Sequence, residues 1–192
     1  MSFLIADQQE NQVQGWEFNP EIDSLVFKGV GNKVKFGEGV KSKGCSIVFL
    51  GSNGALEVEE GCVIQGTFYI ASNSNISIGS GTVFNKKSVF KAAGACSIQV
   101  GEDCLLANVQ LVTADDLPVF DRITKKRINP ADNIEICDRV WLAEYVTVRG
   151  GAKIGRDTVI GAWSTVMGVI PEHSIAAGSP AKVTKSDTVW KK

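Results

Sequence analysis

The sequence predicts an all-β fold, a left-handed parallel β-helix, from three observations. Every sixth residue is aliphatic from Ile136 to Val166, the fifth position of each of these hexads is small or β-branched, and a similar phrase recurs upstream at longer spacing. On an α-helix, a step of six residues rotates by about 600°, so every sixth side chain would not stay on one face. A short strand followed by a turn keeps every sixth side chain on the same buried face. Three such strands form a triangular coil of about 18 residues, whose backbone pairs with the coils above and below.

The hexads are most regular in the C-terminal half. The aliphatic positions are Ile136, Leu142, Val148, Ile154, Ile160 and Val166, and the fifth positions are Val140, Val146, Ala152, Thr158 and Ser164. Upstream, the phrase begins at Phe36, Val58, Ile78 and Val100, so its spacings are 22, 20 and 22 residues. We therefore expect longer upstream coils with short insertions at their corners. Cys62 and Cys104 occupy the small fifth position, which predicts reduced thiols that pack inside the helix.

Two kinds of segment interrupt or flank the repeat within an expected single domain of residues 1–192. Residues 1–30 show no hexads, and we expect them to cap the N-terminal end of β-helix coils that span 31–170. Residues 114–133 are polar, contain two prolines and predict a protruding loop. Residues 171–192 are expected to form a short C-terminal tail.

Composition excludes several classes of function. With 20 basic and 21 acidic residues, the net charge is -1, so no overall field attracts nucleic acid, and any anionic ligand must be held by a local patch. No apolar run approaches the roughly 20 residues that span a bilayer, which predicts a cytoplasmic protein without a membrane span. His173 is the single histidine, so a metal site with several histidine ligands is excluded, and no metal is expected.

Four ordered phrases carry a family resemblance in the C-terminal half. They are INP at 128–130, WLAE at 141–144, KIGRDTVIGAWSTV at 153–166 and IPEHSIAAGSPAKV at 170–183. This half resembles the hexapeptide-repeat acyltransferases, which include maltose, galactoside, xenobiotic and polysaccharide O-acetyltransferases. The resemblance implies a homotrimer that transfers an acetyl group from acetyl-CoA to a sugar or amino sugar, as in surface-polysaccharide modification.

The resemblance also implies a set of CoA-binding residues. Trp141 corresponds to a tryptophan near the thioester, and Ala162 lies in a phrase whose backbone amides bind the pantetheine arm. Lys182 and Lys185 match basic positions that face the CoA phosphates, where fixed positive charge is needed.

The catalytic position departs from the family pattern. Acyl transfer to a hydroxyl needs a general base, and the family histidine corresponds here to Leu117, which lies 24 residues before Trp141. Three explanations remain open. Asp115, Asp116 or Glu144 acts as a substitute base, the acceptor is an amine that needs no strong base, or the chain is an impaired or non-catalytic binding protein or partner subunit. His173 is expected to be a surface loop residue and not the missing base.

Overall fold

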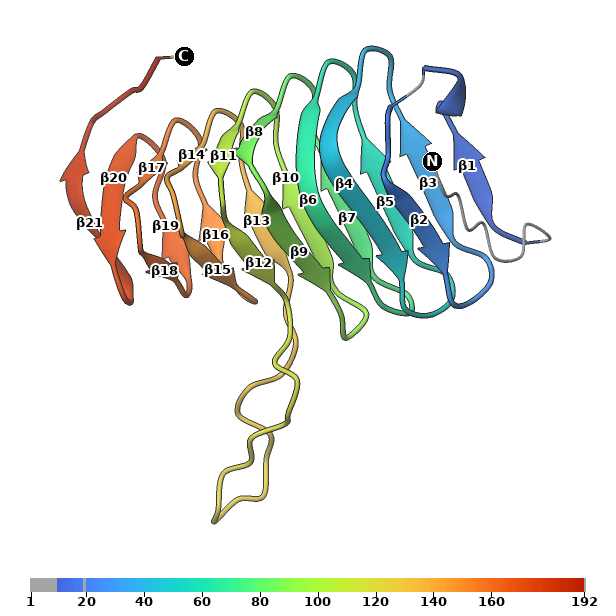
Figure 1. Ribbon diagram of the computed structural model, residues 1–192. Helices are drawn as coiled ribbons and strands as arrows, with labels where there is room; N and C mark the ends of the chain where they lie inside the picture. Colours follow the sequence, from blue (N-terminus) through green and yellow to red (C-terminus); the bar gives the residue numbers. More distant parts are fainter. Residues whose placement is uncertain (1–9, 19, 192) are drawn as a thin grey trace.

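The computed structural model describes residues 10–18 and 20–191, which form a parallel β-helix whose coils stack along one axis (Figure 1). Three strand faces surround the core. Face 1 consists of β1 Gln12–Gln14, β3 Lys33–Phe36, β5 Ala55–Val58, β7 Asn75–Ile78, β10 Ser97–Val100, β13 Ile134–Ile136, β16 Lys153–Ile154 and β19 Val169–Ile170. All neighbouring pairs on this face are parallel. This arrangement confirms the predicted left-handed β-helix class.

The other two faces belong to one continuous sheet that bends around a corner. Face 2 contains β8 Val83–Lys86, β11 Leu105–Ala107, β14 Trp141–Leu142, β17 Val159–Ile160 and β20 Ser174–Gly178. Face 3 contains β2 Ser24–Phe27, β9 Ser88–Ala92, β12 Gln110–Val112, β15 Thr147–Arg149 and β18 Thr165–Val166. The long strands β4 Lys41–Phe49 and β6 Val63–Ile70 run across both faces, which joins them into one sheet. The remaining elements are a short 3-10 helix, η1 Trp16–Phe18, and the C-terminal strand β21 Ala181–Ser186.

The register confirms the repeat read from the sequence. Phe36, Val58, Ile78 and Val100 are successive partners on face 1, and Ile136, Ile154 and Ile170 continue the same column. Each lies inside the helix with 5% or less of its surface exposed. The coil length is therefore 22, 20 and 22 residues upstream, and it falls to 18 between Ile136 and Ile154, where the hexads have no insertions.

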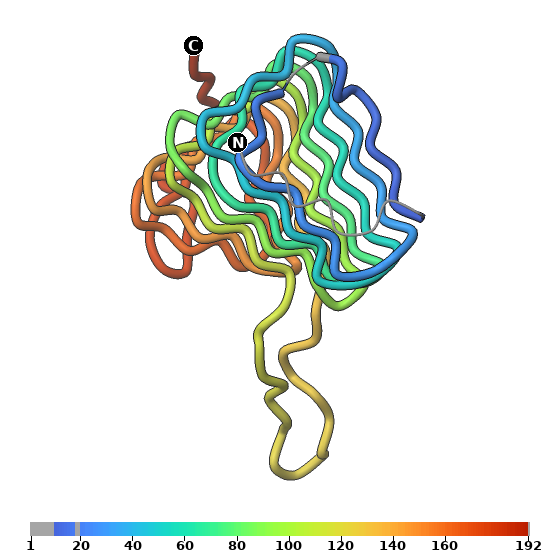
Figure 2. The backbone as a smooth tube through the Cα atoms, turned by 45° about the vertical axis from the view of Figure 1, so that its right-hand side comes forward, coloured from blue at the N-terminus to red at the C-terminus, as the bar shows by residue number. Residues whose placement is uncertain are grey.

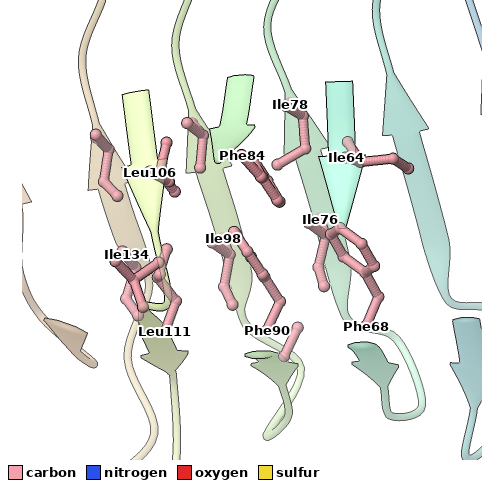
Figure 3. Close-up of a cluster of buried hydrophobic side chains, with 14 of the residues drawn as sticks. Ile64, Phe68, Ile76, Ile78, Phe84, Phe90, Ile98, Leu106, Leu111 and Ile134 are labelled. Atoms are coloured by element: carbon pink, nitrogen blue, oxygen red, sulfur yellow. The ribbon is translucent and has the colours of Figure 1, made fainter. Parts of the chain in front are cut away.

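Aromatic side chains fill the wider upstream coils. Phe68, Phe84 and Phe90 are fully buried, and the ring of Phe90 lies 5.0 Å from that of Phe68 and 5.2 Å from that of Phe84 (Figure 3). Cys62 and Cys104 are also fully buried, as predicted. Burial raises the pKa of the Cys45 thiol to about 12, so this side chain behaves as a small apolar residue.

The two ends of the solenoid differ from the expected cap and tail. Residues 1–9 of the expected cap lie outside the described residues, but β1 pairs in parallel with β3 and β2 with β4, so the described part of 10–30 forms a coil of the helix. Leu25 and Phe27 alternate inward as later strands do, although no hexad marks them. At the other end, β20 still pairs in parallel with β17, and only β21 reverses direction. The predicted boundaries at 30 and 171 therefore lie within coils. Strands at both ends still bury alternate side chains, although the hexad phrase is absent there.

The predicted loop at 114–133 leaves the solenoid between β12 and β13 and extends away from it (Figures 1 and 2). Its two arms run back along each other and meet at an antiparallel bridge between Phe120 and Arg127. The amide of Ile128 also donates to the carbonyl of Val119 at 2.8 Å. The loop is thus an ordered arm, and several of its apolar side chains are exposed.

Close packing between coils predicts a sharp requirement for glycine at one corner. Gly66 has φ +119°, and a Cβ there would lie 1.9 Å from the carbonyl oxygen of Ser88. Gly61 has φ +68°, but a Cβ there would meet nothing within 4 Å. We expect Gly66→Ala to lower the free energy of unfolding by about 2–3 kcal/mol, and the control Gly61→Ala by about 1 kcal/mol. Urea denaturation measures both, and equal losses would contradict the predicted clash.

Candidate active site

The predicted site residues lie on three different edges of the triangular helix. Trp141 begins β14, just past the edge between faces 1 and 2, which we call edge 1/2. Glu144 and Ala162 lie in turns at edge 2/3, and Leu117 lies on the arm that leaves from edge 3/1. Leu117 and Trp141 therefore lie at different edges of the solenoid, and a single copy of the chain does not bring them together.

The predicted CoA-binding residues do share one region of the surface. Trp141 pairs in register with Val159, Val159 with Ile175, and Ile175 with Lys185, so Trp141 and Lys185 end a single row across face 2. This row covers three strand spacings, or roughly 14 Å. Lys182 is paired with Ala177 on the same hairpin and is exposed, as is Lys185. Ala177 in turn packs beside Gly161, which precedes the exposed turn residue Ala162.

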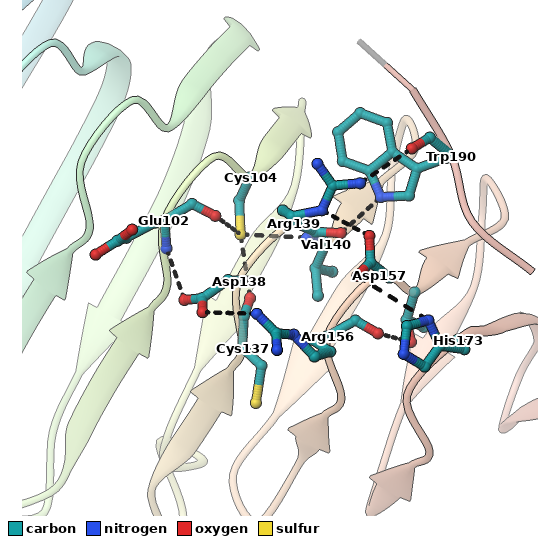
Figure 4. Close-up of polar contacts among 11 residues, drawn as sticks. Glu102, Cys104, Cys137, Asp138, Arg139, Val140, Arg156, Asp157, His173 and Trp190 are labelled. Carbon is teal, nitrogen blue, oxygen red and sulfur yellow. Dashed lines mark hydrogen bonds and ion pairs between the residues drawn. The ribbon is translucent and has the colours of Figure 1, made fainter.

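The C-terminal segment closes one end of this row through Trp190. Its ring lies 6.1 Å from that of Trp141. Its Nε1 donates to the carbonyl of Arg139 at 2.6 Å (Figure 4). The guanidinium of Arg139 donates back to the Trp190 carbonyl at 3.4 Å and to Asp157 Oδ1 at 2.7 Å. Asp157 is 8% exposed, so this ion pair is partly shielded from water. The indole of Trp190 is therefore held beside Trp141 by its hydrogen bonds with Arg139.

His173 belongs to the same edge and lies away from the loop arm. It occupies a left-handed turn with φ +53°, and its Nδ1 lies 4.0 Å from Asp157 Oδ2 (Figure 4). Its side chain is 42% exposed. The expectation that it is a surface turn residue is met, and its neighbour Asp157 belongs to the polar cluster of Arg139 and Trp190.

The two aspartates at the start of the arm face cations on strands that flank β12. Val112, the last residue of β12, is in register with Lys91 on one side and Arg149 on the other. Asp115 forms an ion pair with Arg149, and Asp116 with Lys91. Neither cation was predicted from the sequence. Lys91 lies between the phrases that begin at Ile78 and Val100, and the hexad that contains Arg149 gives no sign that it flanks the loop.

A pocket lies where the arm meets the solenoid. It has a volume of about 320 Å³ and is lined by Thr113, Asp115, Asn129, Asp132, Arg149 and Met167, among others. The side-chain amide of Asn129 donates at 2.9 Å both to Asp115 and to the carbonyl of Leu117. Asn129 thus holds the start of the arm in place, and Asp115 is the one aspartate of the pair that lines the pocket. Leu117 itself is 77% exposed.

The third candidate base, Glu144, lies at edge 2/3. Its carboxylate accepts a hydrogen bond from Lys86 Nζ at 2.5 Å, and this bond and the charge of Glu144 raise the pKa of Lys86. The side chains of both residues are about half exposed. Among residues 10–18 and 20–191, no group of three His, Cys, Asp or Glu side chains is placed to hold a metal ion. In the same part of the chain, no helix is long and apolar enough to cross a membrane.

Comparison with known proteins identifies the repeat. Residues 133–168 match the family described as "Bacterial transferase hexapeptide (six repeats)", and the register of β13 to β18 shows these repeats as stacked coils. Over these residues the chain resembles the hexapeptide-repeat transferases. This resemblance agrees with the fold class and the motifs of the C-terminal half.

Relatives of this hexapeptide-repeat protein include acetyltransferases of known structure. A polysialic acid O-acetyltransferase from Escherichia coli O1:K1 / APEC is 30% identical over 136 residues, covering 70% of this chain and 44% of that protein. The crystal structure of the polysialic-acid-specific acetyltransferase NeuO superposes with a TM-score of 0.84 at 27% identity, covering 95% of this chain and 88% of that one. A galactoside acetyltransferase in complex with coenzyme A matches at 27% identity and a TM-score of 0.51, covering 63% and 58%. The chain spans about half the length of the first curated relatives it matches.

Proposed function

We propose that this chain is an acetyl-CoA-dependent acetyltransferase that modifies a hydroxyl of a sugar, in the cytoplasm, during surface-polysaccharide synthesis. The observation that carries the proposal is the likeness to NeuO over 95% of the chain, which extends beyond the C-terminal half that carries the motifs. Similarity over the C-terminal half alone would leave the acceptor class open. The polysialic acid and galactoside relatives support a sugar acceptor.

Acetyl-CoA is proposed to bind along face 2. The row from Trp141 to Lys185 offers an aromatic surface at one end and positive charge at the other, which suits a ligand with a thioester at one end and phosphates at the other. Trp190 would narrow the thioester end, because it is fixed beside Trp141 by Arg139. The slender pantetheine arm fits beside small residues such as Ala162 and Ala177.

This placement predicts that two lysines carry much of the phosphate affinity. In the double variant Lys182→Ala/Lys185→Ala, we expect the Kd for CoA to rise about tenfold at low salt, corresponding to about 1.4 kcal/mol. Isothermal titration calorimetry measures the change, and the difference should shrink as salt screens the phosphates. Lys33→Ala, an exposed lysine on face 1, is the control and should leave the Kd unchanged. An unchanged Kd for CoA in the double variant would contradict binding of the CoA phosphates by these two lysines.

A homotrimer is proposed because the site is divided between edges. Trp141 and the pocket at the base of the arm lie on different edges of one copy, and the arm projects away from the helix (Figure 2). In a threefold assembly, the arm of one copy would reach face 2 of the next, and the acceptor would bind between them. Sedimentation equilibrium would test this, and a monomer at assay concentration would contradict it.

Asp115 is proposed as the proton acceptor in place of the family histidine. In the reaction, the acceptor oxygen attacks the thioester carbonyl carbon, the C–S bond breaks, and the proton passes from the hydroxyl through the base to the CoA thiolate. Asp115 lines the pocket, whereas Asp116 has a side chain that is 82% exposed and Glu144 lies at another edge. The carboxylate of Asp115 forms an ion pair with the guanidinium of Arg149, which the acceptor hydroxyl must displace or share, so we expect slow turnover.

The direct test follows release of the CoA thiol from acetyl-CoA in the presence of sugars, amino sugars and acidic polysaccharides. Release above the uncatalysed rate that is lost in Asp115→Asn but kept in Asp116→Asn would support the proposal. CoA binding without any release would contradict it. That result would favour the second candidate function, a non-catalytic binding protein or partner subunit, for which Leu117 at the position of the base is the supporting observation.

A further inference from the structure

A second carboxylate residue, Asp132, lines the pocket at the base of the arm. Its backbone amide donates to the carbonyl of Thr113 at 3.1 Å, and the carbonyl of the next residue, Asn133, accepts from the amide of Gly151 at 2.8 Å. These bonds join Asp132 to the corners of two coils, at the point where the arm returns to the solenoid. Asp132 is therefore held by the solenoid, whereas the arm projects away from it.

Two glycines leave space for Asp132 at this corner. At Gly150, a Cβ would lie 2.4 Å from the carbonyl oxygen of Thr113 and 3.0 Å from that of Asp132. At Gly151, which has φ +85°, a Cβ would lie 3.2 Å from Asp132 Oδ2. A side chain at either position would press on Asp132 or on the strand end beside it. Because both positions are glycine, Asp132 remains exposed.

The two carboxylates of the pocket differ in their partners. Asp115 pairs with Arg149 through Oδ1, and its Oδ2 accepts from the side-chain amide of Asn129 at 2.9 Å. Asp132 accepts through Oδ1 from the backbone amide of Asn133 at 2.8 Å. Within residues 10–18 and 20–191, none of the ion pairs includes Asp132. The charge of Asp115 is compensated by a cation, and that of Asp132 is not.

This difference gives the pocket a net negative charge. Its charged lining residues are Asp115, Asp132 and Arg149, and the ion pair of Asp115 with Arg149 leaves one negative charge. The pocket holds about 320 Å³, so a group bound in it lies close to this charge. An ammonium group there meets an opposite charge, whereas a carboxylate meets a like charge.

Two further cations near the base of the arm do not line the pocket. Lys91 forms an ion pair with Asp116, so these two residues add no net charge. Arg127 Nε donates to the backbone carbonyl of Asn129 at 3.1 Å. The negative charge of the lining is therefore not offset by a cation within the pocket itself.

We propose that Asp132 is a specificity-determining residue, which favours an acceptor with an ammonium group beside the reacting hydroxyl and disfavours one with a carboxylate there. The ammonium group donates to the carboxylate of Asp132 and keeps its proton, while the hydroxyl faces Asp115. The selected acceptor is a sugar with a free amino group. This inference rests on the proposed function, because it uses the acceptor pocket assigned there.

Three monosaccharides of similar shape test this selection at about pH 6, where an amine is protonated. Glucosamine carries an ammonium group, glucose carries no charge, and glucuronate carries a carboxylate. Titrations followed by amide resonances of the full chain give the three Kd values without acetyl-CoA. We expect the Kd of glucosamine to be about tenfold below that of glucose, and the Kd of glucuronate to be the highest. Added salt should reduce these differences.

Asp132→Asn keeps the shape of the side chain and removes its charge. We expect it to bring the Kd values of the three sugars to within about twofold of one another, with that of glucose unchanged. Glu172→Gln is the matched control, because it removes the same charge from an exposed turn at edge 1/2. It should keep the order of the three sugars.

Two results would overturn the inference. The first is equal affinity for the three sugars, or binding of none, in the wild-type chain. The second is an unchanged order in Asp132→Asn, which would assign the selection to other groups. Failure of the proposed function looks different. Binding in the expected order without release of the CoA thiol contradicts the transferase alone, whereas release with all three sugars at equal kcat/KM contradicts this inference alone.

Discussion

Leu117→Ala is expected to leave turnover unchanged, whereas Leu117→His is expected to raise kcat by about 10²-fold or more, because a general base contributes about 10²–10⁴-fold to such reactions. Leu117 is 77% exposed, so the substitution should cost little stability. Histidine titrates near pH 6.5, so the added activity should be fully present above about pH 7 and fall as the imidazole becomes protonated below about pH 6. Steady-state thiol release across pH measures both effects.

The control for this gain is a histidine elsewhere on the arm. Ile123 is 81% exposed and lies near the tip, so Ile123→His adds the same side chain without the family position. We expect its rate to match the wild-type rate. Equal rates in Leu117→His and Ile123→His would show that position 117 does not face the acceptor, and the family mechanism would then not apply to this chain.

Phe90→Ala is expected to lower the free energy of unfolding by about 3–5 kcal/mol, because it empties the centre of a coil. Phe90 is fully buried, and it contacts the ring of Phe68 on the preceding coil and that of Phe84 on its own coil. Since each coil in a solenoid depends on its neighbours, the loss should spread to adjacent coils. Urea denaturation followed by circular dichroism gives the change.

The matched control is Phe120→Ala on the loop arm. Phe120 is 56% exposed and lies outside the solenoid core, so we expect a change within about 0.5 kcal/mol. A small effect of Phe90→Ala, close to that of Phe120→Ala, would contradict the view that the aromatic column stabilises the upstream coils.

The solenoid was predictable because its signal is local and repeated. Phe36, Val58, Ile78 and Val100 could be aligned from sequence spacing, and their register in the structure is the predicted one. The N-terminal coil was missed because Leu25 and Phe27 alternate inward without the hexad phrase. A coil packs if alternate side chains are apolar and point inward, whereas its prediction from the sequence depended on the hexad phrase.

The site was less predictable, because its contacts join residues that are distant in sequence. Trp190 donates to the carbonyl of Arg139 across 51 residues, and no periodicity relates the two. The ion pair of Asp115 with Arg149 depends on the register of β12 with β15, which the intervening arm hides from sequence spacing. Trp141 and Lys185 were each identified from a motif. That they lie in one row could be seen only from the register of the strands between them.

The reversal of β21 has a consequence for how the molecule ends. A parallel solenoid exposes an unpaired strand edge at its last coil, and such an edge can accept a strand from another molecule. Here, β21 covers β20 in the opposite direction, and it turns the exposed side chains of Lys182 and Lys185 outward. The same lysines that are proposed to hold phosphates therefore place like charges at the terminus of the stack, so that two molecules meeting end to end would repel each other.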